Sequence, residues 1–196
     1  SPAPVSKHTV WYDGKRGDRF HRTIETNESP AFDALGPVVL TNQSFDIVYA
    51  ARNSSLESKE VQEGEETRTV ESVKVTDLVS RNGSTLATFG RTMAADSAGK
   101  RFLGNSTTDL AIPRAIPNTD NVYYTANADE GVNVGFNDRV DGPFVDVAEL
   151  KPRPTGADVA YFAQKGEQWA VQEGAARGTE LDRMTGRLNF TPDGEQ

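Results

Sequence analysis

The fold is decided by residues 69–89, TVESVKVTDLVSRNGSTLATF, which contain both the strands and the turn of a β-hairpin. Apolar and polar residues alternate from Thr69 to Val79 and again from Thr85 to Phe89, as in half-buried strands. Asn82-Gly83 lies between these runs and favours a two-residue type I′ turn, because both of its positions need a positive φ. This stretch therefore predicts two antiparallel strands that meet at Asn82-Gly83.

The same alternation recurs along the chain. It is clearest at Val132, Val134 and Phe136, which point to one side of a predicted strand while Asn133 and Gly135 point to the other. Turn residues predict two more hairpins, at 129–131 (Asp-Glu-Gly) and at 165–166 (Lys-Gly). The other alternating runs are Thr9 to Tyr12, Phe20 to Thr26, Val38 to Leu40, Phe45 to Ala51, Val122 to Ala126, Phe144 to Leu150, Val159 to Ala163 and Gln168 to Gln172.

Helix signals are few. A short helix is predicted at Ala31 to Leu35, because a serine N-cap and a proline at the first helical position precede it and Gly36 follows it. A second is predicted at residues 179–186, where Thr179 and Asp182 resemble a capping box. The acidic stretch from Leu56 to Glu66 is interpreted as a solvated loop or a frayed helix.

These elements predict an all-β fold: an antiparallel β-sandwich, jelly-roll-like, with one or two short helices. At 196 residues the chain is expected to form a single domain. Residues 1–150 would form the sandwich core with an N-terminal arm. Residues 151–196 would form a C-terminal hairpin and tail, set off by Lys151-Pro152-Arg153-Pro154 as a linker.

The chain has no cysteine and only two histidines, His8 and His21. The lack of cysteine excludes thiol nucleophiles, disulfides and Cys-based zinc sites. The two histidines lie close together near one terminus, so they are expected to be ordinary strand residues rather than metal ligands. We therefore predict no cofactor, no metal site and no catalytic residues, and the protein is not expected to be an enzyme.

The formal net charge of -8 disfavours direct binding to nucleic acid, which needs a basic face. Arginine outnumbers lysine by fourteen to seven, and this balance has two explanations: adaptation to strong brine, or a GC-rich genome. No apolar run approaches the roughly 18 residues of a membrane-spanning helix. The start, Ser1-Pro2-Ala3-Pro4, lacks a signal-peptide pattern and reads as a mature or Met-processed terminus.

Two sequence motifs have both a functional and a structural interpretation. Arg16-Gly17-Asp18 is a tripeptide that integrins recognise, but its residues are also common in turns. Six Asn-x-Ser/Thr triplets indicate either N-glycosylation or turn chemistry. They begin at Asn27, Asn42, Asn53, Asn82, Asn105 and Asn189.

Acidic and aromatic side chains allow two further kinds of site. A pair of carboxylates could support glycosidase chemistry, although a solvated acidic rim is the simpler interpretation. The same acids, with Asn127, Asn133 and Asn137, could bind calcium in the loops around residues 129–141. The candidate acids are Asp129, Glu130, Asp138, Asp141, Asp146 and Glu149. The aromatics that could stack on sugars, or else lie in the core, are Trp11, Tyr12, Tyr123, Tyr124 and Trp169.

The leading functional hypothesis is a structural virion protein, a capsid or shell subunit that assembles with itself through side-to-side contacts. The host would be halophilic or have a high-GC genome, and the location would be the virion or an extracellular surface. Residues 1–4 and the segment after Pro154 would reach neighbouring copies or other virion proteins. Two alternatives remain open: a carbohydrate-binding module or secreted glycosidase on the same fold, and a phage tail-tube or adaptor subunit.

Overall fold

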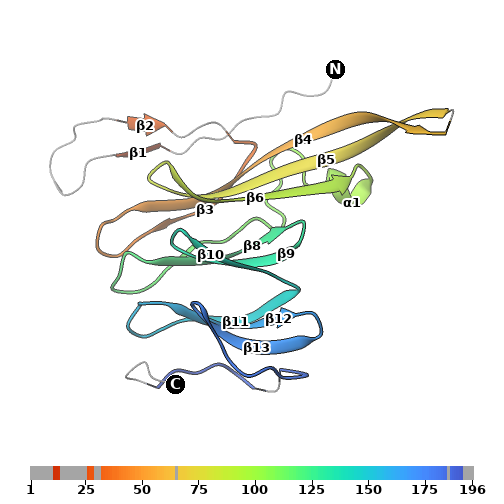
Figure 1. Cartoon of the computed structure of the whole chain (residues 1–196). Helices are drawn as coiled ribbons and strands as arrows, with labels where there is room; N and C mark the ends of the chain where they lie inside the picture. The colour runs from red at the N-terminus through yellow and green to blue at the C-terminus, as the bar shows by residue number, and fades with distance from the viewer. Residues whose placement is uncertain (1–10, 14–25, 29–31, 65, 185, 192–196) are drawn as a thin grey trace.

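The computed structural model describes residues 11–13, 26–28, 32–64, 66–184 and 186–191, and it has an all-β, sandwich-like fold (Figure 1). Three antiparallel four-stranded sheets lie one above another, in chain order. Sheet 1 contains β3 (Ala34–Leu40), β4 (Ile47–Glu63), β5 (Glu66–Arg81) and β6 (Ser84–Ala94). Sheet 2 contains β7 (Arg114–Ala115), β8 (Val122–Ala128), β9 (Gly131–Phe136) and β10 (Arg139–Phe144). Sheet 3 contains β11 (Asp146–Pro152), β12 (Val159–Lys165), β13 (Gln168–Glu173) and β14 (Ala176–Arg177).

Within each sheet the neighbouring strands are consecutive in sequence, so each sheet is a meander. The all-β, sandwich-like prediction is confirmed. The described strands do not cross between sheets as jelly-roll strands do. A separate two-stranded ribbon pairs β1 (Trp11–Asp13) with β2 (Thr26–Glu28). No helix in the described ranges is long and apolar enough to cross a membrane.

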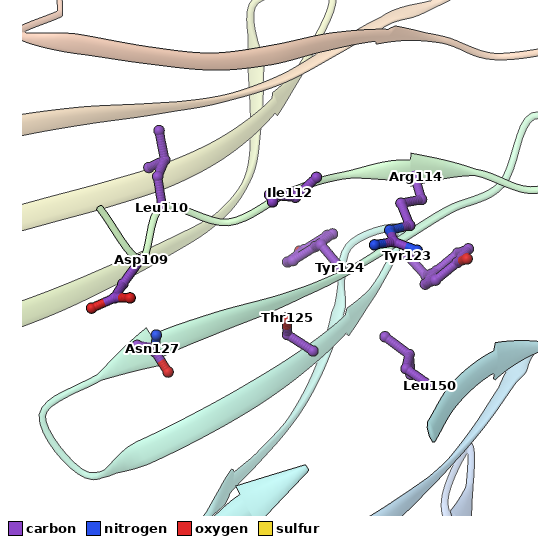
Figure 2. Close-up of a pocket in the computed structure, with 9 residues that line it drawn as sticks. All are labelled: Asp109, Leu110, Ile112, Arg114, Tyr123, Tyr124, Thr125, Asn127 and Leu150. Carbon is purple, nitrogen blue, oxygen red and sulfur yellow. The ribbon is translucent and has the colours of Figure 1, made fainter. Parts of the chain in front are cut away.

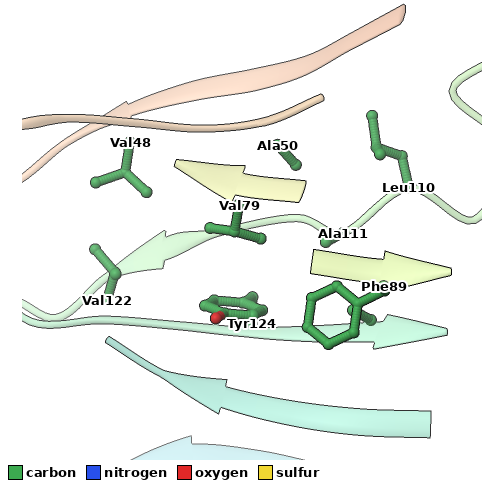
Figure 3. Packing of buried hydrophobic residues seen from close by; sticks show 9 residues of the cluster. Val48, Ala50, Val79, Phe89, Leu110, Ala111, Val122 and Tyr124 are labelled. Atoms are coloured by element: carbon green, nitrogen blue, oxygen red, sulfur yellow. The ribbon is translucent and has the colours of Figure 1, made fainter. Parts of the chain in front are cut away.

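Two apolar layers hold the stack together. Between sheets 1 and 2, Val48, Val79 and Phe89 pack against Val122 and Tyr124 (Figure 3). The Phe89 and Tyr124 rings meet edge to face, with their centroids 6.3 Å apart. Because β9 lies in the middle sheet, both of its faces are covered, although the alternation predicted one solvated face.

The second apolar layer joins sheets 2 and 3. Val134 and Phe144 of sheet 2 pack against Val159 and Tyr161 of sheet 3. The Phe144 and Tyr161 ring centroids are 5.8 Å apart. The segment after Pro154 is therefore part of the three-sheet body as far as β12.

The predicted hairpins are confirmed. Asn82 and Gly83 have φ values of 50° and 80°, as a type I′ turn requires, and the Asn82 side chain accepts the Ile47 N–H at 2.8 Å. Tight turns also join β8 to β9 at 129–130 and β12 to β13 at 166–167.

Replacing Gly83 with valine should lower the free energy of unfolding by at least about 1 kcal/mol, because a β-branched residue resists a positive φ. Urea denaturation followed by circular dichroism measures this loss. Thr85→Val is the control, because this exposed position in β6 already carries a β-branched residue. Equal stability of the two variants would contradict the role assigned to the turn.

Both helix predictions are wrong where the structure describes them. Phe32 is buried, and residues 34–35 begin β3, where Tyr49 and Ala51 of β4 complete an apolar cluster on the outer face of sheet 1. Burial of this apolar face outweighs the local capping pattern. The Thr179 segment is irregular, and Leu181 forms a β-bridge with Trp169 instead.

The α-helix in the described ranges is α1 (Ser97–Lys100), whose N-cap Asp96 accepts the Gly99 N–H at 2.8 Å. The segment that follows it covers a buried charged cluster on the inner face of sheet 1. Arg52 donates hydrogen bonds from Nε and Nη2 to the two carboxylate oxygens of Asp77, at 2.6 and 2.8 Å. Arg91 donates to the same carboxylate at 2.9 Å. The Phe102 ring lies 5.3 Å from the Arg52 guanidinium and 4.8 Å from that of Arg91.

The two outer edges of sheet 1 differ. At β6, Asp129 from the β8–β9 turn accepts the Thr92 N–H at 2.8 Å and donates its own N–H to the Gly90 carbonyl at 3.2 Å. At the opposite side, β3 pairs with β4 only as far as Arg52. Beyond Arg52, β4 has no strand partner on this side among the described residues.

Candidate functional site

A pocket of about 410 Å³ opens beside β8, where the neighbouring strand β7 is only two residues long (Figure 2). Pro113 directly precedes β7 and lacks an N–H group, so the ladder cannot continue in that direction. The residues that line the pocket are Asp109, Leu110, Ile112, Arg114, Tyr123, Tyr124, Thr125, Asn127 and Leu150. Its volume lies in the range of small-molecule sites.

The two ends of the pocket have opposite charge. Figure 2 shows the Arg114 guanidinium beside Tyr123 at one end and the Asp109 carboxylate near Asn127 at the other. Within the described ranges, the side chains of Arg114 and Asp109 have no hydrogen-bonded or ionic partner, and both residues are exposed. Leu110 is buried in the core between sheets 1 and 2 and anchors the segment that carries Asp109. A small ligand with separate polar groups could contact both ends.

Tyr124 lines this pocket, but its role is structural. Burial, and secondarily the charge of Asp138, raise its pKa to about 12. Its hydroxyl donates a hydrogen bond to the Asn137 carbonyl at 3.2 Å. Burial and then Asp141 also raise the pKa of Tyr161. Both phenols are therefore protonated near neutral pH and cannot serve as general bases.

Four of the six candidate carboxylates are in separate contacts. Asp129 protects the edge of β6, and Asp141 accepts a hydrogen bond from Tyr161 at 3.2 Å. Asp146 accepts the N–H of the next residue, and Glu149 lies 3.5 Å from the Lys151 ammonium. No group of three or more potential metal-ligating side chains occurs in the part of the chain that the structure describes.

The other residues singled out in the sequence do not gather at one site. Asn137 is structural, because its Oδ1 accepts hydrogen bonds from Arg81 and from the Val122 N–H. Trp169 of β13 packs against the apolar cluster on the outer face of its own sheet, and Tyr123 forms a wall of the pocket. The predictions for His8, His21, Arg16-Gly17-Asp18 and residues 1–4 lie outside the described residues.

A second candidate site is a projecting ribbon, which we call the arm: residues 53–63 of β4 and 66–71 of β5, joined by a turn at Gly64 (Figure 1). The residues of β4 and β5 pair continuously as far as Glu63 and Glu66. Nearly all side chains of the arm are exposed, on both faces of the ribbon. The prediction of a loop or frayed helix for this stretch is wrong, because continued pairing of β4 with β5 keeps it extended without a buried face.

The edges of the arm are as open as its faces. The pairing of β5 with β6 ends at Ser72, so residues 66–71 have no second strand partner among the described residues. The arm can therefore bind another chain through its backbone as well as through its side chains. Comparison with known proteins finds no matching family model, no similar curated protein and no similar solved structure.

Proposed function

We propose that this protein is a structural subunit of a virion shell, which assembles with copies of itself at a virion or extracellular surface. The arm is the observation that carries the proposal. A two-stranded ribbon is marginally stable in water unless another surface covers it. An arm whose 17-residue strand β4 projects beyond the body contributes little to the core, but it can contact a neighbouring subunit.

Salt should promote assembly. Subunits with a formal charge of -8 repel one another, and the Debye length falls from about 30 Å at 0.01 M to about 3 Å at 1 M ionic strength. Light scattering should therefore show a mass that increases with salt at fixed protein concentration. A monomer at every salt and protein concentration would contradict the proposal. Negative-stain microscopy then distinguishes a shell from a ring or tube, the form that a phage tail-tube or adaptor subunit would take.

A shortened variant tests the arm directly. Replacing residues 58–71 with Asn-Gly would join Glu57 to Ser72, which already face each other, through the type of turn that the chain uses at Asn82-Gly83. We expect the body to keep its melting temperature, because the removed residues are exposed, and the salt-induced oligomers to disappear. Unchanged oligomers would show that another surface drives assembly.

The pocket favours a second candidate function, binding of an acidic sugar. Tyr123 offers an aromatic wall, and Arg114 beside it could pair with a carboxylate. On a glycan array, acidic oligosaccharides should then bind, and Arg114→Ala should weaken the affinity about tenfold or more, since a hydrogen bond to a charged group contributes about 1.5–3 kcal/mol. No binding, or equal binding by the variant, would exclude this function for the pocket.

A further inference from the structure

We infer that the arm pairs with the arm of a second copy, edge to edge along β4, around a two-fold axis at Ser58. This inference rests on the proposed self-assembly and names its contact. The two ribbons would form one four-stranded antiparallel sheet, with β4 of each copy at the centre. The two bodies would lie at opposite ends of the paired arms.

The backbone of β4 is oriented for this pairing. The Arg52 carbonyl accepts the Asp33 N–H at 2.9 Å, and the Ser54 N–H donates to the Asp33 carboxylate at 2.7 Å, both on the β3 side. Because backbone groups alternate along a strand, the even-numbered residues beyond Ser54 direct their N–H and C=O groups to the same side. These residues are Leu56, Ser58, Glu60 and Gln62. No described strand pairs with them there.

The length of the free edge limits the register. Because the Ser54 N–H is bonded to Asp33, the free outward groups run from the Ser54 carbonyl to Gln62, near the end of β4, and they admit centres at Ser58 and at Lys59. Antiparallel pairing around Ser58 places Leu56 of each copy opposite Glu60 of the other, and it places Gln62 where its N–H can reach the Ser54 carbonyl. Ser58 faces Ser58 of the second copy as a hydrogen-bonded pair, because its backbone groups point outward.

The charges select the register at Ser58. Around Ser58, Glu57 of each copy lies opposite Lys59 of the other, twice by symmetry. These are non-hydrogen-bonded pairs, in which the opposing Cα atoms approach to about 4.5 Å and the side chains come closest. Lys59 is exposed and has no ionic partner among the described residues, and Glu57 has only the exposed Lys74 at 3.7 Å.

Other registers fit less well. Pairing around Glu57 or around Lys59 would place that charge opposite itself, which is unfavourable. Pairing around Val61 would set Lys59 opposite Glu63, but it would leave the edge from Asn53 to Ser58 unused. The register at Ser58 combines pairing along most of the free edge with opposite charges.

Cysteine cross-linking tests the register, and the chain has no native cysteine to interfere. In the proposed dimer, the two Ser58 Cα atoms lie about 5.5 Å apart, within the range of a disulfide. Under mild oxidation, in salt at which the wild type assembles, Ser58→Cys should give mainly covalent dimer. Ser55→Cys is the matched control, because this exposed serine of the same strand would lie about 20 Å from its counterpart.

A charge exchange tests the pairing independently. In E57K the two opposed positions are both lysine, and in K59E they are both glutamate. At the lowest ionic strength at which the wild type assembles, where screening is weakest, each variant alone should lose dimer about threefold or more. An equimolar mixture should recover it, because each position then meets its opposite charge. Circular dichroism of each variant checks that it is folded.

The outcomes separate the inference from the proposed function. Selective cross-linking at Ser58→Cys together with recovery in the mixture supports the inference. Assembly with equal cross-linking of Ser55→Cys, or with undiminished dimer in E57K and K59E, overturns this register but leaves self-assembly standing. A wild type that stays monomeric at every salt concentration overturns both.

Discussion

Asp77→Ala should lower the free energy of unfolding by about 3–5 kcal/mol, the cost of breaking a buried ion pair on one side. Asp77 is the shared acceptor of Arg52 and Arg91, and the Arg52 side chain is completely buried. Without the carboxylate, two guanidinium groups would remain beneath the segment that carries Phe102. The carbonyls of Ser106 and Thr108, which accept hydrogen bonds from Arg52 at 3.1 and 2.8 Å, cannot neutralise this charge.

Urea denaturation compares this variant with Glu63→Ala. Glu63 lies 3.6 Å from Arg68 on the arm, where both side chains are exposed, so its loss should change stability by about 0.5 kcal/mol or less. Asp77→Asn retains the shape of the side chain but not its charge, and it should be destabilising too. If Asp77→Ala were no worse than Glu63→Ala, the buried cluster would not have the structural role described.

Gly135→Ala should lower the free energy of unfolding by about 1–3 kcal/mol or more, the usual cost of overpacking a core. A Cβ atom at Gly135 would lie 2.1 to 2.6 Å from three ring carbons of Tyr124, its partner on the neighbouring strand. The Tyr124 ring would have to move, and its contact with Phe89 and its hydrogen bond to Asn137 would move with it.

Gly90→Ala is the matched control. Gly90 lies in β6, also with an ordinary φ, and a Cβ atom there would have no neighbour within 4 Å. This variant should be neutral or slightly stabilised, because alanine reduces the conformational freedom of the unfolded chain. Similar melting curves for the two variants would contradict the close packing of Tyr124 on Gly135.

Local chemistry explains which elements could be predicted from sequence. Asn82-Gly83 specifies its turn almost alone, since few residue pairs accept two positive φ angles. The helix predicted at Ala31 to Leu35 rested on equally local signals, yet Phe32 is buried against sheet 1 and Ala34 is buried within it, as the first residue of β3. Tertiary burial outweighs a capping pattern that covers barely two turns.

The two candidate sites show more clearly what the alternation of apolar and polar residues cannot predict. The arm has no buried face, so the stretch around Ser58 and Glu60 lacks the apolar alternation that identifies a strand. Its conformation follows from the register of β4 with β5, which is set where Ala50 and Val79 are buried. The pocket depends on how residues 109–112 and Leu150 of sheet 3 meet β7 and β8, and no single segment encodes that arrangement.

Asp129 has a consequence for aggregation. Its contacts with Gly90 and Thr92 occupy hydrogen-bonding groups on the outer edge of β6, which would otherwise be a template for another strand. Sheet 1 is thus obstructed along β6, and its open edges are those of the arm, along β4 and along residues 66–71 of β5. A contact that pairs the β4 edge with its own copy uses up that edge and closes after two molecules. Any larger shell would then need a second, different interface.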